Sequence, residues 1–258
     1  MSDVQTIRSP DDPRIAPFRE LKDKQLAARH GLFVVEGEWP VRRLLDSPFA
    51  VHSLLMTPER ALTGWQTAAP IFIADTSILA QIVGFNFHRG VLALGVRPKL
   101  LRLAELLHDL PRRLVVLPEI NDPENLGSLM RTGAALGYRH FLLGPSCCDP
   151  FARRAVRTSM GAVFSLILAR SAEMLNDLRL LRAAGFSLHA AVVGENAKPL
   201  HEISPPPKAA LLFGAEAFGL GAEITTLCDQ SVTIPTAAGV DSLNVCIAAG
   251  IVMSHYRF

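Results

Sequence analysis

The stretch from 120 to 137 reads INDPENLGSLMRTGAALG and follows a short apolar run, LVVLP at 114–118. The apolar run predicts a buried strand, and the stretch after it predicts a helix that begins near Asn125. Gly127 and Arg131 are four residues apart and therefore share one face of this helix. Helix capping by the asparagine and solvation of the arginine explain these residues structurally. Ligand binding explains them too, because open α/β sheets bind ligands at the carboxyl ends of their strands.

The chain from 114 onward alternates regularly between strand and helix signals. Expected strands lie at 114–118, 138–143, 163–169, 186–193, 209–213 and 231–234, and expected helices at 125–137, 150–159, 171–184, 221–229 and 243–257. These strands are apolar throughout, which is typical of a parallel sheet with helices on both faces. A Pro-rich loop at 198–208 interrupts the alternation.

The first hundred residues also alternate between helix and strand signals. Expected helices lie at 15–29, 38–46 and 76–83, and expected strands at 32–37, 51–56, 71–75 and 91–96. Residues 97–113 are amphipathic between Pro98 and Pro111, which predicts a linker helix. The sequence therefore predicts an α/β protein with a smaller domain at 1–97, a linker at 98–113 and a second domain at 114–258.

Composition places the chain among ordinary globular proteins. Of its 258 residues, 49% are apolar and 19% are charged, and the net charge is +2. This charge is too small to indicate a nucleic-acid partner, so a basic surface would require local clustering. The start of the chain lacks a secretory signal, and the longest apolar run, 246–253, is far shorter than the ~20 residues of a membrane span. We expect a cytoplasmic protein with no membrane partner.

The four cysteines form no C-x-x-C pair and have no histidine spacing suited to zinc. We therefore expect reduced thiols and no metal.

A second motif is LLFGAEAFGLG at 211–221, a buried strand that runs into a glycine-rich turn. It does not match the dinucleotide fingerprint, because Glu216 occupies the second glycine position of G-x-G-x-x-G. It also lacks the Gly-Lys-Ser/Thr of a phosphate loop. Since a carboxylate would repel a pyrophosphate, the turn suits an adenosyl ligand without phosphate, such as S-adenosyl-L-methionine.

A third motif is VTIPTAAGVDSLNVCIAAG at 232–250, in which Ile234 and Pro235 end a strand. Capping of the last helix by Asp241 or Ser242 explains its polar residues. On that interpretation three apolar residues belong to the core, namely Leu243, Ile247 and Ile251. Capping does not explain why loops of small residues follow three strand ends.

With these motifs in this order and spacing, the chain resembles the SpoU (TrmH) branch of the SPOUT RNA methyltransferases, which methylate ribose 2′-hydroxyls. The resemblance spans 114–258. It is carried by N-x-G-x-x-x-R (Asn125, Gly127, Arg131), G-x-E-x-x-G-L (Gly214, Glu216, Gly219, Leu220) and I-P…S-L-N-V (Ile234, Pro235, Ser242, Leu243, Asn244, Val245). Ala217 and Ala238 stand where the family often has glycine.

The segment FVVEGEWPVRRLL at 33–45 resembles the RNA-binding domain, similar to ribosomal protein L30e, that many of these enzymes carry. The resemblance implies that the C-terminal domain forms a trefoil knot, with residues near 212–214, 234–235 and 242–245 as its crossing loops. It also implies a homodimer.

The resemblance further implies the residues of the active site. The adenosyl group would be held by Gly214, Ile234 and Leu243, with Ala191 as a weaker candidate. The catalytic residues would be Arg131, Asn125, Glu216, Ser242 and Asn244. Family mechanisms assign deprotonation of the hydroxyl to the arginine, but a guanidinium is effectively always protonated. Arg131 therefore suits a phosphate clamp that stabilises the developing alkoxide, and Glu216 suits an organiser of the turn better than a base.

Two clusters of basic residues are candidates for RNA phosphate contacts. Arg153 and Arg157 lie four apart on one expected helix face, and a solvated face explains them equally well. The second cluster contains Arg14, Arg19 and Lys22. By analogy with enzymes that carry the extra domain, ribosomal RNA is favoured over transfer RNA as the substrate. A nicotinamide dehydrogenase and a catalytically silent RNA-binding protein are the alternatives.

Overall fold

The computed structural model describes residues 3–19, 23–83, 90–109, 111–194, 196–215, 218–237 and 242–257. The chain divides into two compact units. The first contains Met1–Lys99 and Pro150–Phe164, and the second contains Leu100–Asp149 and Ser165–Phe258. The sequence assigns 150–164 to the C-terminal domain, but in the structure this segment packs within the first unit.

The first unit contains a five-stranded mixed sheet in the order β1-β4-β3-β5-β2. Its strands are β1 (Val4–Thr6), β2 (Leu32–Glu36), β3 (Val51–Met56), β4 (Ile71–Ile73) and β5 (Val91–Val96). β4 runs parallel to β1 and β3, whereas β5 runs antiparallel to β2 and β3. Its helices are η1 (Pro13–Ile15), α1 (Ala16–Arg19), α2 (Asp23–His30), α3 (Glu38–Leu45), α4 (Pro58–Ala61), α5 (Thr76–Val83) and α8 (Arg153–Thr158), with η2 (Ala162–Ser165) at the end of the second segment.

Segment 150–164 belongs to this unit because β2 is buried on both faces. Leu32 and Val34 belong to one apolar cluster of the core. The ring of Phe33 lies 5.1 Å from that of Phe151 and 5.8 Å from that of Phe164. Because two aromatic rings of segment 150–164 pack against Phe33, this segment lies on the N-terminal sheet.

The second unit contains a seven-stranded sheet in the order β10-β12-β9-β11-β6-β7-β8, and every paired strand is parallel to its neighbour. Its strands are β6 (Arg113–Leu117), β7 (His140–Leu143), β8 (Ile167–Arg170), β9 (Ser187–Ala191), β10 (Lys198–Pro199), β11 (Ala209–Leu212) and β12 (Gln230–Thr233). Its helices are α6 (Leu103–Leu107), α7 (Pro123–Ala135), α9 (Met174–Ala183), η3 (Leu200–Glu202), α10 (Ala222–Leu227) and α11 (Val245–His255). The predicted parallel α/β architecture is confirmed.

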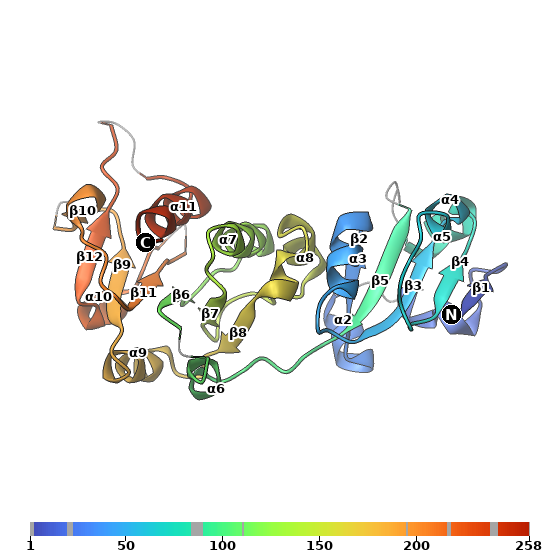
Figure 1. Ribbon diagram of the computed structural model, residues 1–258, viewed down its shortest axis with the longest axis horizontal. Helices are drawn as coiled ribbons and strands as arrows, with labels where there is room; N and C mark the ends of the chain where they lie inside the picture. The colour runs from blue at the N-terminus through green and yellow to red at the C-terminus, as the bar shows by residue number, and fades with distance from the viewer. Residues whose placement is uncertain are drawn as a thin grey trace. The chain divides into compact units, whose positions relative to one another are not determined.

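Helices cover both faces of this sheet, as Figure 1 shows. On one face, α6, α9 and α10 pack against alternate strand residues such as Leu114, Val116 and Leu212. On the other face lie α7 and α11, and a Cβ on Gly133 of α7 would lie 2.5 Å from the ring of Phe141. The strands are therefore apolar throughout because both of their sides are buried.

Three local predictions require correction. The expected strand at 163–169 begins only at Ile167, because 162–165 forms η2 and Phe164 belongs to the aromatic cluster of the first unit. The expected linker helix is reduced to α6. The strands β1 and β10 were not predicted, and both are short edge strands, of three and two residues.

Candidate functional site

Four neighbouring strands of the second unit end at the same edge of its sheet. In the register, Leu212 of β11 pairs with Ala190 of β9 and with Val116 of β6. Ala191 pairs with Val232 of β12. The predicted cofactor residues Ala191, Gly214 and Ile234 therefore lie at or just beyond adjoining strand ends, although long stretches of sequence separate them.

The turn after β11 requires glycine at its first position. A Cβ on Gly214 would lie 2.2 Å from the backbone carbon and oxygen of Gly219. The backbone N–H of Gly219 donates to the carbonyl oxygen of Ala215 at 2.8 Å, and the φ of Gly219 is 63°. This turn is therefore folded tightly onto itself. Glu216 and Ala217 lie outside the described residues, so the role predicted for Glu216 stays a prediction.

The first motif opens α7, but Asn125 does not cap this helix. The cap is Asp122, whose side chain accepts a hydrogen bond from the N–H of Glu124 at 2.8 Å. Asn125 lies half-buried in the first turn. The expected helix start at Asn125 is therefore two residues late, because the helix already begins at Pro123.

The third motif opens α11, and its cap is Asn244 rather than Ser242. The Asn244 side chain accepts a hydrogen bond from the N–H of Cys246 at 2.9 Å. The Cys246 thiol in turn lies 3.4 Å from the carbonyl oxygen of Asn125 and 3.5 Å from its side-chain oxygen. The structure therefore joins the first motif to the third through a thiol that the sequence analysis did not single out.

A second loop supports the entry into α7. The Cys147 thiol donates to the carbonyl oxygen of Leu117 at 2.9 Å and accepts from the N–H of Ile120 at 3.2 Å. Arg170, at the end of β8, donates to the carbonyl oxygens of Gly144 and Cys147, both at 2.8 Å. Burial raises the pKa of Cys147, which keeps the thiol protonated and able to donate. These contacts give the buried cysteine a structural role.

The remaining site residues differ in exposure. Arg131 is exposed on α7, Ser242 is exposed before α11, and Leu243 is half-buried. Two apolar side chains of the same strand-end loops are also exposed, Val193 at 71% and Phe218 at 91%. The sequence analysis did not single out either residue, although a phenylalanine beside glycines in a turn is a recognisable signal.

The C-terminal helix is fixed to the sheet by a buried polar network. His189 of β9 contacts the Tyr256 hydroxyl at 2.6 Å, and the Tyr138 hydroxyl donates to the carbonyl oxygen of Met253 at 2.9 Å. The Arg113 guanidinium donates to the carbonyl oxygen of Tyr256 at 2.7 Å. Burial raises the pKa of Tyr138 to about 12 and lowers the pKa of His189, so both groups are neutral at pH 7. The network holds α11, and with it Asn244, at the strand ends.

The residues predicted to bind RNA lie in the first unit, and most of them have structural partners. Arg14 donates to Asp12 and Gln5, and its hydrogen bonds lower the pKa of Asp12 to about 2. Arg19 donates to the carbonyl oxygen of Pro10 at 2.7 Å. Lys22 lies outside the described residues.

Arg153 and Arg157 both lie on α8. The guanidinium of Arg153 donates two hydrogen bonds to the buried carboxylate of Glu36, at 2.8 and 3.0 Å. This ion pair accounts for Arg153 without RNA. Arg157 is half-buried.

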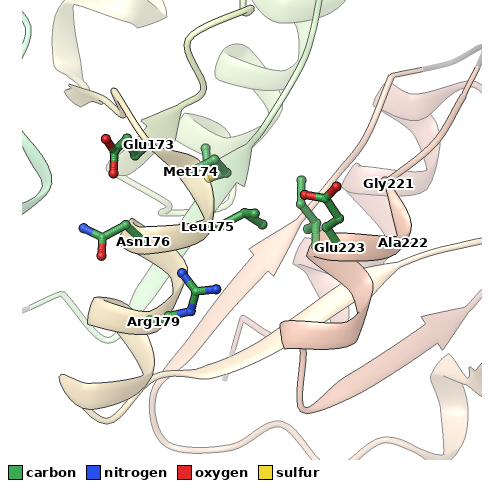
Figure 2. A pocket seen from close by; sticks show the side chains of 9 residues that line it. Glu173, Met174, Leu175, Asn176, Arg179, Gly221, Ala222 and Glu223 are labelled. Carbon is green, nitrogen blue, oxygen red and sulfur yellow. The ribbon is translucent and has the colours of Figure 1, made fainter.

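A pocket of about 650 Å³ lies between α9 and α10. Figure 2 shows Asn176 and Arg179 on α9 and Glu223 on α10 around it. Of the residues that line this pocket, only Gly221 belongs to one of the three motifs, as the last residue of the second. The place of the pocket on the α9 and α10 face of the sheet separates it from the contact between α7 and α11, so we do not assign it to the motif residues.

The described residues contain no group of three or more His, Cys, Asp or Glu side chains arranged to hold a metal ion. No helix in the described part of the chain is long and apolar enough to cross a membrane.

The fold and the site together define a class of protein: an open parallel α/β sheet whose tight, small-residue loops meet at adjoining strand ends without a phosphate-binding fingerprint. The SpoU rRNA Methylase family matches residues 112–254, and the chain belongs to this family. The resemblance noted in the sequence is therefore confirmed, which sets the dehydrogenase alternative aside.

Individual relatives match almost the whole chain. An uncharacterized tRNA/rRNA methyltransferase of Mycobacterium tuberculosis is 37% identical, over 96% of this chain and 90% of the relative. The 23S rRNA (guanosine(2553)-2′-O)-methyltransferase RlmP of Bacillus subtilis is 25% identical, over 98% of this chain and 100% of the relative. The crystal structure of an AdoMet-bound rRNA methyltransferase from Sinorhizobium meliloti superposes with a TM-score of 0.84 at 26% identity, over 98% of this chain and 97% of that chain.

Proposed function

We propose that this protein transfers a methyl group from S-adenosyl-L-methionine to a ribose 2′-hydroxyl of ribosomal RNA. The observation that carries the proposal is the contact between Cys246 and Asn125, which brings the first and third family motifs together. Two relatives support it by name, since one methylates a guanosine 2′-hydroxyl of 23S rRNA and the other is an rRNA methyltransferase with AdoMet bound.

The strand ends suit an adenosyl group better than a phosphate. Gly214 packs directly on the backbone of Gly219. A ligand at this glycine-rich turn would meet backbone N–H and C=O groups, which can hydrogen-bond an adenine or a ribose. We assign this cradle to Gly214, Ile234 and Leu243, with Ala191 at its rim. The bound cofactor would supply an electrophilic methyl group, so the protein has to position the acceptor oxygen and remove its proton.

Arg131 is assigned to the substrate phosphate. Its guanidinium stays protonated at any accessible pH and can form paired hydrogen bonds with phosphate oxygens. Held beside the acceptor ribose, it would stabilise the alkoxide that develops as the proton leaves to the phosphate or to water. Asn125, Ser242 and Asn244 would orient the ribose and the loop before α11, and Glu216 would organise the turn after Gly214.

A methyl-incorporation assay with labelled cofactor tests this proposal. Ribosomal RNA and transfer RNA from cells that lack the gene should be offered separately, and the product should be mapped for 2′-O-methyl groups. Methylation of ribosomal RNA is expected. Methylation of transfer RNA alone would favour the alternative substrate, and no incorporation together with no heat in a calorimetric titration of the cofactor would indicate a silent RNA-binding protein.

Substitution of Arg131 tests its role within that assay. Arg131→Ala should abolish transfer and leave cofactor affinity nearly unchanged, whereas Arg131→Lys should recover only part of the activity because it lacks the paired donors. Arg139→Ala is a matched control, since Arg139 is an exposed arginine of the same unit. Retained turnover in Arg131→Ala would remove this residue from the mechanism.

We further propose that the protein is a homodimer and that α11 lies in its interface. Ile247 and Ile251, one turn apart on α11, are 57% and 41% exposed. Their prediction as core residues is therefore wrong, because the buried face of α11 is formed by Ala249, Val252 and Met253. A pair of exposed isoleucines on a helix that carries site residues suits a self-complementary contact.

A trefoil knot in the C-terminal domain is also part of the proposal. The arrangement that supports the knot is the path of the chain after β12. This strand is second from one edge of the sheet, yet the helix that follows it, α11, turns back toward the middle of the sheet and packs on α7. The first unit, with residues 1–97 as its main part, is proposed to bind RNA, and 98–113 is proposed to link it to the methyltransferase domain.

A further inference from the structure

The exposed indole of Trp39 has no structural explanation within the first unit. Trp39 lies on α3 and is 68% exposed, although Pro40, Val41 and Leu44 of the same helix are buried. An indole exposes a large apolar surface, and tryptophans in that position are enriched at binding interfaces.

The other tryptophan of the chain, Trp65, has an indole that is buried and held by contacts within the first unit. Trp65 is 9% exposed, its ring is covered by the Arg42 guanidinium at 4.5 Å, and its N–H donates to the carbonyl oxygen of Arg60 at 2.7 Å. Trp39 differs from Trp65 in its wide exposure, so its ring faces are accessible to a partner.

A chain of contacts links α3, which carries Trp39, to the turn after α8. Arg43, one helical turn after Trp39, is exposed, and it donates to the carbonyl oxygen of Met160 at 2.8 Å. The N–H of Met160 donates to the carbonyl oxygen of Arg157 at 3.0 Å. A Cβ on Gly161 would lie 3.1 Å from the Cα of Pro40. The turn after α8 therefore packs against α3, and Met160 links the backbone of Arg157 to the side chain of Arg43.

Nearby acidic groups do not cancel this charge. Glu38, beside Trp39, is bound by Arg42 at 2.9 Å and by Arg60 at 2.7 Å. Glu36 is buried and paired with Arg153. Arg154, on α8, is exposed. The result is an accessible aromatic ring on a helix that also carries the exposed Arg43, with Arg157 linked to Arg43 through Met160.

We propose that Trp39 is a stacking platform for an unpaired base of the RNA substrate, with Arg43 and Arg157 holding the phosphates beside it. An aromatic ring flanked by cations is the arrangement that binds single-stranded nucleic acid, because each base has a π-face and each nucleotide a negative charge. A duplex hides its base faces and would use only the arginines. This inference rests on the proposed function, because it names the part of the RNA that the first unit recognises.

Anisotropy titrations of the full-length protein with three labelled probes test the inference. The probes are a single-stranded oligoadenylate, an abasic ribose-phosphate oligomer of the same length and an RNA duplex. Trp39→Ala should weaken oligoadenylate binding by roughly ten- to a hundredfold, and it should change binding of the abasic probe little. Trp39→Phe should keep most of the affinity, since it retains an aromatic face.

Two further variants separate stacking from charge. Arg43→Gln should weaken binding of all three probes and lower the salt slope by about 1. Leu62→Ala is the control, because Leu62 is an apolar side chain that is 88% exposed in the same unit and has no aromatic face on which a base could stack. It should leave every affinity unchanged.

The outcomes distinguish this inference from the proposed function. Wild-type affinity of Trp39→Ala for oligoadenylate, or wild-type binding to the duplex alone, would overturn the stacking role even if methylation of ribosomal RNA is normal. Absence of methyl transfer in the wild type would overturn the proposed function instead. A change in sedimentation of Trp39→Ala with unchanged RNA affinity would show that the indole serves a protein contact, and the stacking role would be wrong.

Discussion

The thiol of Cys246 lies 3.4 Å from the backbone carbonyl oxygen of Asn125 and thereby joins the first turns of α7 and α11. These two helices are 121 residues apart at this contact, yet they carry the motif residues Asn125, Arg131 and Asn244. The distance between the helices at this point is therefore set by a half-buried cysteine.

A larger side chain at position 246 should separate these helices. In Cys246→Leu we expect methyl transfer at saturating RNA to fall by roughly a hundredfold, because displacements near 1 Å can have this effect on an oriented reaction. Cys246→Ala, which removes only a weak hydrogen bond, should retain most of the rate. Equal rates in the two variants would show that the contact does not position the site.

The turn after β11 provides a second test, in which two glycines of the same loop serve as test and control. Gly214→Ala places a Cβ 2.2 Å from the Gly219 backbone, whereas a Cβ on Gly221 would meet nothing within 4 Å. Gly214→Ala should destabilise the fold by about 1–3 kcal/mol and lower cofactor affinity at least tenfold. Gly221→Ala should change neither quantity. Calorimetric titration of the cofactor and thermal unfolding measure both.

Much of this architecture could be predicted from the sequence because burial on two sides gives a strand a distinct pattern. The parallel sheet, the order of its elements and the three strand-end loops were all visible in this way. The strand order in space was not, because adjacent strands such as β6 and β11 are separated by nearly a hundred residues of chain. The packing of aromatic residues around Phe33 is also long-range. For this reason the sequence did not show that 150–164 belongs to the first unit.

The misplaced helix caps have a local physical cause. Several residues near the start of each helix have side chains that can cap it, namely Asp122 and Asn125 for α7 and Ser242 and Asn244 for α11. The sequence alone does not tell which of them serves as the cap. Pro123 at the first helical position decides the case for α7. The exposure of the isoleucines on α11 could not be predicted for a different reason. The sequence of a helix that is apolar on all sides does not show which face is buried.

The pair formed by Glu36 and Arg153 predicts a loss of stability for single substitutions. The side chain of Glu36 is 7% exposed and that of Arg153 is 23% exposed, so removing one partner leaves a charge in a largely buried place. Arg153→Ala should destabilise the first unit by about 3 kcal/mol, toward the lower end of the range for buried pairs. The double variant with Glu36→Gln should lose less than the sum of the two single variants.

Tryptophan fluorescence in a urea titration measures this loss in the first unit alone, because both tryptophans of the chain belong to it. Arg154→Ala is the control, since Arg154 is the exposed neighbour on α8. Unchanged stability of Arg153→Ala together with weaker RNA binding would return Arg153 to the RNA surface.

The buried His189 predicts that the protein loses stability in mild acid. Burial lowers the pKa of this imidazole below its ordinary value of 6.5, while Asp229 opposes the shift and Arg113 adds to it. Between the lowered pKa and 6.5 the unfolded chain binds more protons than the folded protein, so stability falls as pH decreases through this window.

The melting temperature should therefore drop between about pH 7.5 and about pH 5.5, and this drop should be smaller in His189→Gln. His201→Gln is the control, because His201 is exposed in the same unit. An equal pH dependence in wild type and His189→Gln would place the acid sensitivity elsewhere.

The proposed dimer leads to the last prediction: a charge on the exposed face of α11 should weaken the association of the two subunits. Ile247 is 57% exposed and Leu180, on α9 of the same unit, is 50% exposed, so a glutamate at either position should leave the folded unit intact. If α11 forms the interface, Ile247→Glu would bury one carboxylate from each subunit in the contact between the two copies of the chain. The protein should then shift to monomers in sedimentation velocity experiments. Leu180→Glu should sediment like the wild type. Since α11 also carries Asn244 at its first turn, the Ile247→Glu monomer should retain its melting behaviour and lose methyl transfer if the site depends on the interface. A monomeric wild type, or an Ile247→Glu variant that remains dimeric, would show that these isoleucines have another role.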